Sequence, residues 1–516
     1  MKSSRPDGPT TKNKLFLALL ALVGVGFVLV STHRYGVVIW PDSVYYLSTA
    51  RNLNSGAGFI SFDGEPLTLW PPLYPALLAF VSRIFGTDPL VIASIVNALI
   101  FGFIVYLAGT VLFRHLSSSP ILAIQGTLAF LFAIPLFSIA VIAYTEPLFI
   151  LLVLLSFIFL GTYLSTPSIP SLVLLSLSVS LALLTRYVGI ILLPWAAVFI
   201  ILFNRGPLKK RIAHLALFAL ITSLPVGIWL IRNYVVSHSL SGPRTRPVFS
   251  ISQILSFGSK NILDWYIPAA ITRHLWILLV VCAVFVFLIG FSLKGSWQGL
   301  KVKPTHDNPV VMFFIACGSF IIFYAGFVVI SATISYVSVF ESRIWAPIFV
   351  PLTFLIFLSA RVAGQHFGKF LNGRSVNSIM IGVITVCLVY PVVSTVSYAA
   401  NLVAYGDGIG GAGWMNSETI QYIRNNPDEC TYYSNGPDVI YFLVHVNAKW
   451  VPSRGGVMAD LSSQKGIWPQ ETRACLVWFD NINRTTLFRP DELLPITNLA
   501  QVIQLGYGVI YIVTRK

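Results

Sequence analysis

The chain has 516 residues, of which 56% are hydrophobic and only 10% are charged, a balance far from that of soluble domains. A net charge of +15 would suit a nucleic-acid-binding protein, but no stretch interleaves basic and aromatic residues as such surfaces do. We therefore exclude nucleic acid as a partner. The composition predicts a multi-pass protein of the cell membrane, in which Lys and Arg on cytoplasmic loops set the orientation.

Apolar stretches of about 20 residues, the length that crosses a bilayer, recur along the chain. No small-residue cleavage site follows the first stretch, so we expect a retained span rather than a removed signal peptide. An odd number of spans puts the two ends of the chain on opposite sides. We predict eleven spans, near residues 15–33, 88–112, 120–141, 147–164, 170–185, 188–204, 212–232, 269–293, 309–332, 344–361 and 378–400.

Most basic clusters fall on the loops of one side, which the positive-inside rule assigns to the cytoplasm together with the N-terminus. The opposite side receives the first loop, residues 34–87, and the loop 233–266. Arg244 and Arg246 are basic residues on this otherwise basic-poor side. Their position suggests that they bind an anion.

The composition changes near Tyr405, which divides the chain into a membrane domain, 1–404, and a small soluble α/β domain, 405–516. The polar surface of this domain must face water, so the span count places it outside the cytoplasm. We expect a helix at Ser417–Asn425 with Ser417 as its N-cap. We expect β-strands at Thr431–Ser434, Val439–Val444, Ala474–Phe479 and Gly508–Val513.

Of the five cysteines, Cys282, Cys317 and Cys387 lie in apolar runs, where we expect small core residues. Cys430 and Cys475 lie in the soluble domain. The simpler expectation is that they are two separate, partly buried thiols. If their two β-rich runs are adjacent strands, a disulfide becomes the alternative, because an extracytoplasmic location permits it.

Asp42 is the most informative acidic residue, because it follows the first span directly. A helix starting here would place Asp42, Tyr45, Tyr46 and Thr49 on one side, by spacings of three and four residues. A carboxylate at the mouth of a membrane domain is costly unless it is hydrated or paired, which makes it a candidate for function. Two ordinary interpretations stand beside this one: a solvated loop residue and a helix N-cap.

Glu146 is a second carboxylate at the same predicted membrane face, in Ala-Tyr-Thr-Glu-Pro after the third span. It is either a first-turn glutamate that the helix dipole favours or a partner of Asp42 in proton transfer or cation binding. The sequence predicts no definite cofactor and leaves a divalent cation open.

Arginines gather at this face too. Guanidinium groups match phosphate oxygens in geometry, so one shared phosphate explains them more simply than separate snorkelling side chains. The candidate substrate-binding residues are Tyr46, Arg51, Trp70, Arg186, Arg232, His238, Arg244, Arg246, Glu341 and Arg343.

The order of these features resembles the GT-C superfamily of integral-membrane glycosyltransferases, and most of all its bacterial branch with aminoarabinose transferase and protein O-mannosyltransferases. The resemblance implies a GT-C-like fold with about eleven spans and a small C-terminal domain. It rests on Asp42, Ala50-Arg-Asn-Leu with Gly56 and Gly58, Pro-Pro-Leu-Tyr-Pro, Thr145-Glu-Pro, Leu184-Thr-Arg, Pro225–Arg232-Asn233, and Glu341-Ser-Arg343 before Pro347.

The resemblance implies an enzyme that takes a hexose or pentose from a polyprenyl-phosphate carrier. The acceptor would be a hydroxyl of a glycan, a lipid or a protein at the outer membrane face. By motif position Asp42 becomes the base that acts on this hydroxyl, and Glu146 a second acidic position. One base without a covalent nucleophile implies inversion at C1.

One position departs from the family pattern. Relatives often carry Lys before the paired prolines, where this chain has Trp70, so one expected phosphate partner is missing. The alternative function is a transporter or flippase for a lipid-linked or anionic solute. Transporters place ionisable groups near the bilayer midplane, whereas the acidic residues here lie at span ends beside a soluble domain. This arrangement favours the enzyme.

Overall fold

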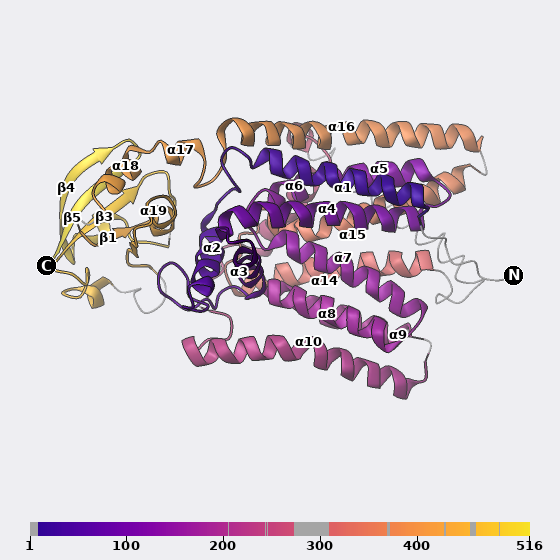
Figure 1. Ribbon diagram of the computed structural model, residues 1–516, viewed down its shortest axis with the longest axis horizontal. Helices are drawn as coiled ribbons and strands as arrows, with labels where there is room; N and C mark the ends of the chain where they lie inside the picture. Colours follow the sequence, from indigo (N-terminus) through magenta and orange to yellow (C-terminus); the bar gives the residue numbers. More distant parts are fainter. Residues whose placement is uncertain are drawn as a thin grey trace. The chain divides into compact units, whose positions relative to one another are not determined.

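The computed structural model divides the chain into two compact units, and each is described by itself (Figure 1). The helical unit takes the chain up to Ser31, Thr68–Tyr74 and Ser94–Ala400; the loop–sheet unit takes Thr32–Leu67, Pro75–Ala93 and the chain from Asn401 onward. The structure describes residues 9–204, 206–242, 244, 246–272, 309–368, 372–427, 430–454, 461–484 and 486–516.

The helical unit is built from long apolar helices that lie beside one another (Figure 1). Within the described residues, seven helices are long and apolar enough to cross a membrane. They are α1 (Thr11–Ser31), α4 (Pro89–His115), α7 (Glu146–Ser165), α10 (Leu208–Ser237), α14 (Pro309–Ile334), α15 (Ser342–Phe367) and α16 (Gly373–Tyr405). Helices α5 (Pro120–Leu131) and α6 (Ile134–Ala140), which meet at a bend of 41°, make an eighth if they form one span.

Two further predicted spans are shorter apolar helices: α8 (Ile169–Thr185), and η1 (Tyr187–Ile191) continued by α9 (Leu192–Leu202). Every predicted span therefore coincides with a helix or a helix pair, except the one near 269–293. That span lies outside the described residues apart from its first turn, α12 (Ala269–Thr272). The prediction of a multi-pass α-helical membrane protein is confirmed, and the total of eleven spans stays a prediction.

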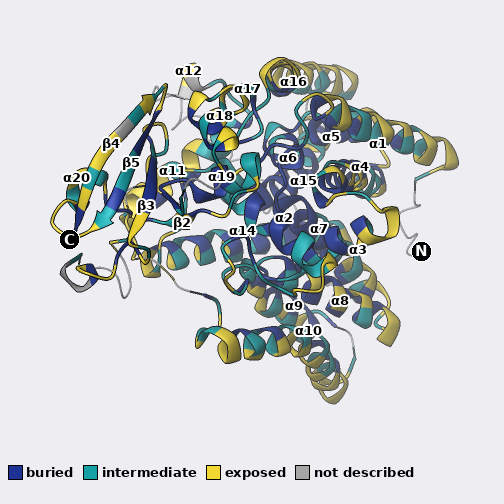
Figure 2. Cartoon of the chain, turned by 60° about the vertical axis from the view of Figure 1, so that its left-hand side comes forward, coloured by how far each residue is buried: buried dark blue, intermediate teal, exposed yellow. Residues whose placement is uncertain are grey.

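Burial distinguishes inner helices from outer ones (Figure 2). In the apolar stretch of α15, 72% of the residues are buried, against 22% in α1 and 11% in α16. Helix α15 packs against α5, α7, α14 and α11 (Ile251–Asp264), so it is held from several sides. The exposed apolar sides of α1 and α16 are suited to lipid, which is as apolar as they are.

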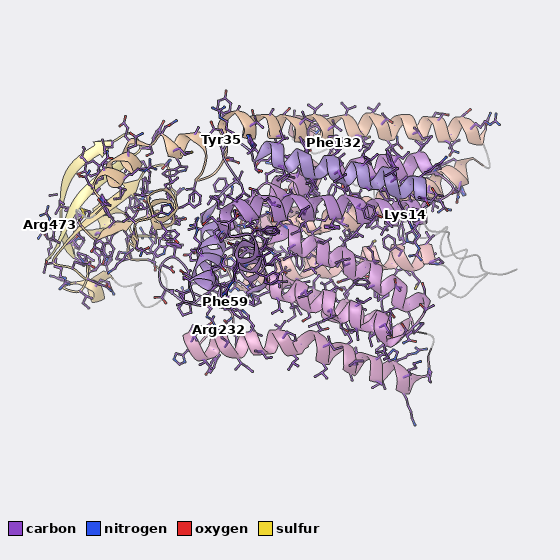
Figure 3. All side chains as sticks on the ribbon, viewed as in Figure 1. Lys14, Tyr35, Phe59, Phe132, Arg232 and Arg473 are labelled. Carbon is purple, nitrogen blue, oxygen red and sulfur yellow. A yellow bond between two sulfur atoms is a disulfide. The ribbon has the colours of Figure 1, made fainter. Side chains whose placement is uncertain are left out.

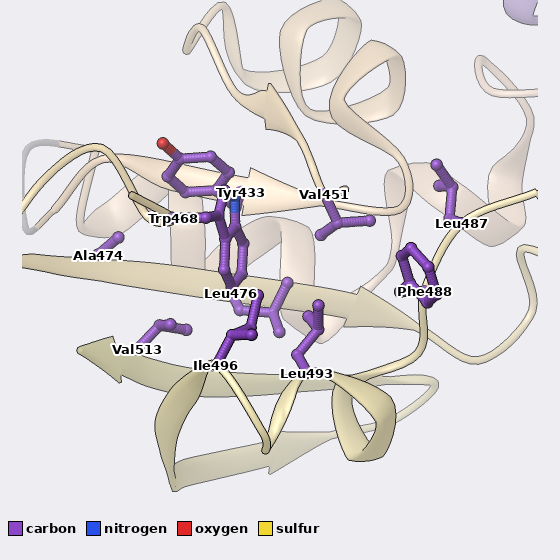
Figure 4. Packing of buried hydrophobic residues seen from close by; sticks show 10 residues of the cluster. All are labelled: Tyr433, Val451, Trp468, Ala474, Leu476, Leu487, Phe488, Leu493, Ile496 and Val513. Carbon is purple, nitrogen blue, oxygen red and sulfur yellow. The ribbon is translucent and has the colours of Figure 1, made fainter. Parts of the chain in front are cut away.

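The loop–sheet unit contains a mixed five-stranded sheet in the order β2-β1-β3-β5-β4. Its strands are β1 (Tyr432–Ser434), β2 (Lys449–Trp450), β3 (Arg473–Phe479), β4 (Thr497–Leu505) and β5 (Gly508–Arg515). Strand β1 pairs in parallel with β2 and β3, and β5 pairs antiparallel with β3 and β4. Figure 4 shows how Leu476 of β3 and Val513 of β5 pack with Trp468, Leu493 and Ile496 in the core of this sheet.

One predicted strand of this region is wrong, because residues 439–444 belong to helix α19 (Pro437–Val444). Pro437 lies at the first helical turn, where its missing N–H costs nothing, and Asp438 follows in the same turn. The buried Val439 and Ile440 show that packing overrides their β-propensity. Strands β2 and β4 were not predicted. The predicted helix is present as α18 (Glu418–Asn425), with Ser417 at its N-cap position but without a side-chain capping bond.

Cys430 and Cys475 form a disulfide, with their Cα atoms 5.8 Å apart. Cys475 lies opposite Tyr432 in the parallel pairing of β3 with β1, so the two β-rich runs are indeed adjacent strands. The expectation of two separate thiols is therefore wrong. Cys317 is buried as expected, whereas Cys387 is exposed on α16 and does not belong to the core. Cys282 lies outside the described residues.

The loop after α1 packs with the C-terminal region in the loop–sheet unit. Ile39 and Gly408 form a parallel β-bridge, and the N–H of Ile409 donates to the Ile39 carbonyl at 2.8 Å. The rings of Phe62 and Tyr441 lie 5.3 Å apart between centroids. These contacts support the expectation that the first loop and the C-terminal domain share one side of the membrane.

Candidate active site

Asp42 lies in the first turn of α2 (Pro41–Asn54), in the loop–sheet unit. Trp40 is the N-cap of this helix, and its backbone N–H donates to Oγ of Ser43 at 3.2 Å. The N-cap interpretation of Asp42 is therefore wrong. Its partly buried side chain lies one turn before Tyr46, which is 1% exposed and anchors the helix.

The hydroxyl of Tyr45 lies among charged groups of the same unit. Burial raises the pKa of Tyr45, the carboxylates of Asp63, Asp438 and Asp42 raise it further, and Arg484 opposes them. Asp438 and Arg484 are paired by two hydrogen bonds, of 2.7 and 3.0 Å. Helix α2 thus places Tyr45 within electrostatic reach both of Asp42 and of charged residues more than 390 positions later in the chain.

Arg51, a candidate for substrate binding, is engaged in an ion pair. Its Nε and Nη2 donate to the two carboxylate oxygens of Asp88 at 2.9 and 3.0 Å. This pair joins the last turn of α2 to the residue that precedes α4. Arg51 therefore has a structural role that is independent of any substrate.

Glu146 begins α7 in the helical unit, and its side chain is 1% exposed. Nη1 of Arg186 lies 2.5 Å from its Oε1, and Nη1 of Arg343 lies 3.6 Å from the same oxygen. The hydroxyl of Thr145 donates to Oε2 at 3.2 Å and accepts from Nη1 of Arg186 at 2.9 Å. Burying a carboxylate is expensive unless it is paired, and the two guanidinium groups supply that pairing.

The two arginines come from distant parts of the sequence. Arg186 has extended backbone at the junction of α8 and η1, and Arg343 lies in the first turn of α15. Nε of Arg343 donates to Glu341 at 2.5 Å, and its guanidinium carbon lies 4.4 Å from the centre of the Tyr144 ring. The side chains of Arg186 and Arg343 are 20% and 15% exposed, so both are held in place yet accessible.

Tyr187 organises a second group of candidates in the helical unit. Its hydroxyl donates to the carbonyl of Thr68 at 2.9 Å and accepts from the Trp229 ring and the Asn233 amide, both at 3.1 Å. Asn233 also donates to the carbonyl of Leu240 at 3.0 Å. One hydroxyl thus ties together the segment before Trp70, the end of α10 and the loop that leads to Arg244.

The remaining candidates come from the same stretches of the chain as the residues of this group. Arg232 places its guanidinium 4.8 Å from the Trp229 ring centre near the end of α10 (Figure 3). His238 ends the helix with left-handed backbone, φ 54°. Trp70 is half-buried, and Arg244 and Arg246 are exposed. The helical unit therefore brings Arg186, Arg343, Glu341 and Glu146 into direct contact.

The residues of this cluster do not form a cation site. Within the described part of the chain, no three His, Cys, Asp or Glu side chains are grouped so that they could hold a metal ion. The Glu146 carboxylate is already paired with arginines, whose positive charge repels a cation. The arrangement is suited instead to an anion with several oxygens.

Sequence reasoning did not name Thr145, Tyr144, Tyr187 or Asn233 as candidate site residues. Three of them lie next to a residue that it did name: Thr145 beside Glu146, Tyr187 beside Arg186 and Asn233 beside Arg232. Tyr144 is two residues from Glu146. Their neutral side chains give no charge signal in an apolar chain, and only their contacts reveal a role.

The chain is similar to known proteins in part of its sequence and in its fold. Residues 70–229 match the family model described as dolichyl-phosphate-mannose-protein mannosyltransferase. None of the curated proteins matches the chain. Apo ArnT from Cupriavidus metallidurans is similar in structure, with a TM-score of 0.61 and 15% identity over 97% of this chain and 98% of that one.

Two other solved structures extend the comparison. ArnT from Cupriavidus metallidurans bound to undecaprenyl phosphate has a TM-score of 0.60 and 15% identity, over 96% of this chain and 98% of that one. Arabinofuranosyltransferase AftD from Mycobacteria has a TM-score of 0.54 and 12% identity, over 99% of this chain and 40% of that one.

Structural similarity at sequence identities of 12% and 15% establishes the fold alone. The chain is a multi-pass membrane protein that shares its fold with ArnT and AftD, and the predicted resemblance to the GT-C superfamily is confirmed at the level of the fold. The matched family segment, residues 70–229, contains Trp70, Glu146, Arg186 and the Tyr187 network partner Trp229.

Proposed function

We propose that this protein is a glycosyltransferase that moves a sugar from a polyprenyl-phosphate donor to an acceptor hydroxyl at the extracytoplasmic face. The observation that carries the proposal is the pair Arg186 and Arg343, held around the buried Glu146 in a GT-C fold. A structure of ArnT with undecaprenyl phosphate supports the choice of donor, because it combines this fold with a lipid phosphate.

The arginines are assigned to the donor phosphate. A guanidinium has five N–H donors and can pair with a carboxylate and a phosphate at once. As the bond from C1 to the phosphate oxygen breaks, negative charge grows on the departing polyprenyl phosphate, and fixed donors stabilise it. Glu146 is then a positioning residue, which keeps both guanidinium groups in place and offsets their mutual repulsion.

Asp42 is assigned to the acceptor. Its carboxylate takes the proton from the acceptor hydroxyl while the hydroxyl oxygen attacks C1 of the sugar. The new glycosidic bond forms as the bond to phosphate breaks, through an oxocarbenium-like transition state. Attack from the face opposite to the leaving phosphate inverts the configuration at C1. The acceptor is a glycan, a lipid or a protein, and the transferred sugar is a hexose or pentose.

The proposed orientation follows from the charge distribution. The N-terminus lies in the cytoplasm, and the first loop and the C-terminal domain lie outside it, because the basic loops are retained inside. Donor and acceptor then meet on the outer side of the cell membrane.

The test uses the full-length protein in lipid nanodiscs. Radiolabelled lipid-linked sugars extracted from the native cells are added, together with total envelope glycans, lipids and proteins as acceptors. Transfer of label to an acceptor with release of polyprenyl phosphate is expected. Movement of intact lipid-linked sugar across sealed proteoliposomes, without cleavage of the sugar–phosphate bond, would instead identify a flippase.

A further inference from the structure

A polar hollow of about 810 Å³ opens in the loop–sheet unit, and none of the predicted site residues lines it. Its walls come from β3, β5, Arg454 and described residues within 480–484 and 487–492. The volume falls within the range of about 300–1,000 Å³ that is typical of ligand pockets.

Two aromatic side chains, Trp478 and Tyr511, form part of the hollow's lining. Trp478 is paired with Val509, and Tyr511 with Leu476, so both rings lie on the same face of neighbouring strands. Both pack against the sheet core, which fixes them, and both are only partly buried, which leaves ring surface accessible.

Three polar side chains accompany these rings. Asp480, Asn483 and Asp491 line the hollow, are exposed, and form no side-chain hydrogen bond or ion pair with other described residues. Burial raises the pKa of Tyr511, and the carboxylates of Asp480 and Asp491 raise it further, so both lie within electrostatic reach of its hydroxyl. The hollow therefore combines hydrogen-bonding groups with aromatic surface.

The charges of the hollow are balanced. Arg454 donates to Glu492 at 2.5 Å, and Arg484 is held by the buried Asp438. Three arginines and three carboxylates line the hollow, and the Asp438 that holds Arg484 lies outside the lining, so the lining has no excess positive charge. A phosphate would need such an excess, and within the described residues no three His, Cys, Asp or Glu side chains are grouped to hold a metal ion, so a neutral polyhydroxylated ligand fits better.

We propose that this hollow binds a saccharide and is the site where the acceptor is recognised. A sugar ring presents C–H groups to an aromatic face and hydroxyls around its edge, which match Trp478 and Tyr511 together with Asp480, Asn483 and Asp491. The assignment of this saccharide as the acceptor rests on the proposed function. Arg484 supports the assignment of the saccharide as the acceptor, because this residue lines the hollow and also acts electrostatically on the Tyr45 hydroxyl. Tyr45 in turn lies within electrostatic reach of Asp42 in the same unit.

The first experiment measures binding without catalysis. Full-length protein in detergent is applied to an array of neutral, amino and acidic oligosaccharides, and the tightest binder is titrated in solution. Replacing Asp491→Asn or Asn483→Ala should weaken binding by roughly threefold to tenfold, and Trp478→Ala by at least as much. Tyr507→Ala is the matched control, because Tyr507 is 77% exposed in the same unit and does not line the hollow.

The second experiment measures transfer. In Asp491→Asn and Asn483→Ala, whose exposed side chains can change without disturbing the core, the KM for the acceptor should rise while kcat and the KM for the donor stay the same. Equal saccharide binding by all variants, or no bound saccharide for the unaltered protein, would overturn the inference. Normal transfer with an unchanged acceptor KM would also overturn it, and would leave the proposed function standing.

Discussion

Arg186 places Nη1 2.5 Å from Oε1 of Glu146, and so joins the end of α8 to the beginning of α7 through a carboxylate that is 1% exposed. Arg343 approaches the same oxygen from α15. One buried negative charge on α7 thus holds two positive charges, one at the end of α8 and one at the beginning of α15, which favours a positioning role for Glu146 over that of a base.

Glu146→Gln should lower both stability and donor affinity. Removing one member of a buried ion pair costs about 3–5 kcal/mol, because the partner charge stays behind unpaired. Thermal unfolding of the purified protein should therefore begin at a lower temperature. The double variant Glu146→Gln with Arg186→Gln should recover part of the loss, since it removes the unpaired charge. A Glu146→Gln protein of unchanged stability, with only kcat reduced, would contradict the positioning role and favour a base.

Arg186→Lys and Arg343→Lys should impair use of the donor although the charge is kept, because lysine lacks the planar fork that matches a phosphate. We expect the donor KM to rise by about tenfold to a hundredfold, the loss of one charge-assisted hydrogen bond. Arg244→Lys tests whether the next loop contributes. Arg83→Lys, at an exposed position of α3 (Leu73–Phe85), is the matched control. Full donor affinity in all three variants would remove the assignment of these arginines to phosphate.

Asp42→Asn should reduce transfer by at least about a hundredfold, the usual scale for a general base, while expression and thermal stability hold. The amide keeps the shape of the side chain but cannot take a proton. Glu65→Gln changes another acidic residue of the same loop, whose side chain is exposed, and should leave turnover unaffected. A well-folded Asp42→Asn protein with near-normal turnover would disprove the role of Asp42.

Replacing both Cys430 and Cys475 by serine should destabilise the loop–sheet unit by about 2–4 kcal/mol, because the disulfide closes a long loop in the unfolded chain. The measurement is thermal unfolding of the full-length protein, followed by tryptophan fluorescence. Cys387→Ser is the control, because this thiol is free and exposed on α16. Identical unfolding of the double variant and the control would show that the disulfide adds no stability.

Gly408→Ala should disrupt the attachment of the first loop to the C-terminal region. Gly408 has φ 62°, and a Cβ built there would overlap the carbonyl of Ile39. Both the positive φ and the overlap oppose a side chain, and a strained residue alone costs about 1–3 kcal/mol. Limited proteolysis should cut the first loop faster. Gly413→Ala, where nothing lies within 4 Å of the added carbon, should digest like the unaltered protein.

The sequence alone was enough to predict a multi-pass membrane protein, and the structure has helices at nearly all of the predicted spans. Long apolar stretches admit one structure in a bilayer, because only a helix satisfies its own backbone there. It was enough to predict helix α18 and strands β1, β3 and β5, and the order of short motifs such as Thr145-Glu-Pro indicated the superfamily. These signals depend on residues that are close together in the sequence, so they can be recognised without a structure.

The contacts between distant residues were decided only by the tertiary structure. The pairing of Glu146 with Arg186 and Arg343, the bond between Cys430 and Cys475, and the engagement of Arg51 by Asp88 each depend on which elements pack together. Helix α19 replaced an expected strand for the same reason, because burial outweighs the weak β-propensity of a short apolar run. The charges and the periodicity of the sequence indicate candidate residues, but only tertiary packing determines which of them come into contact.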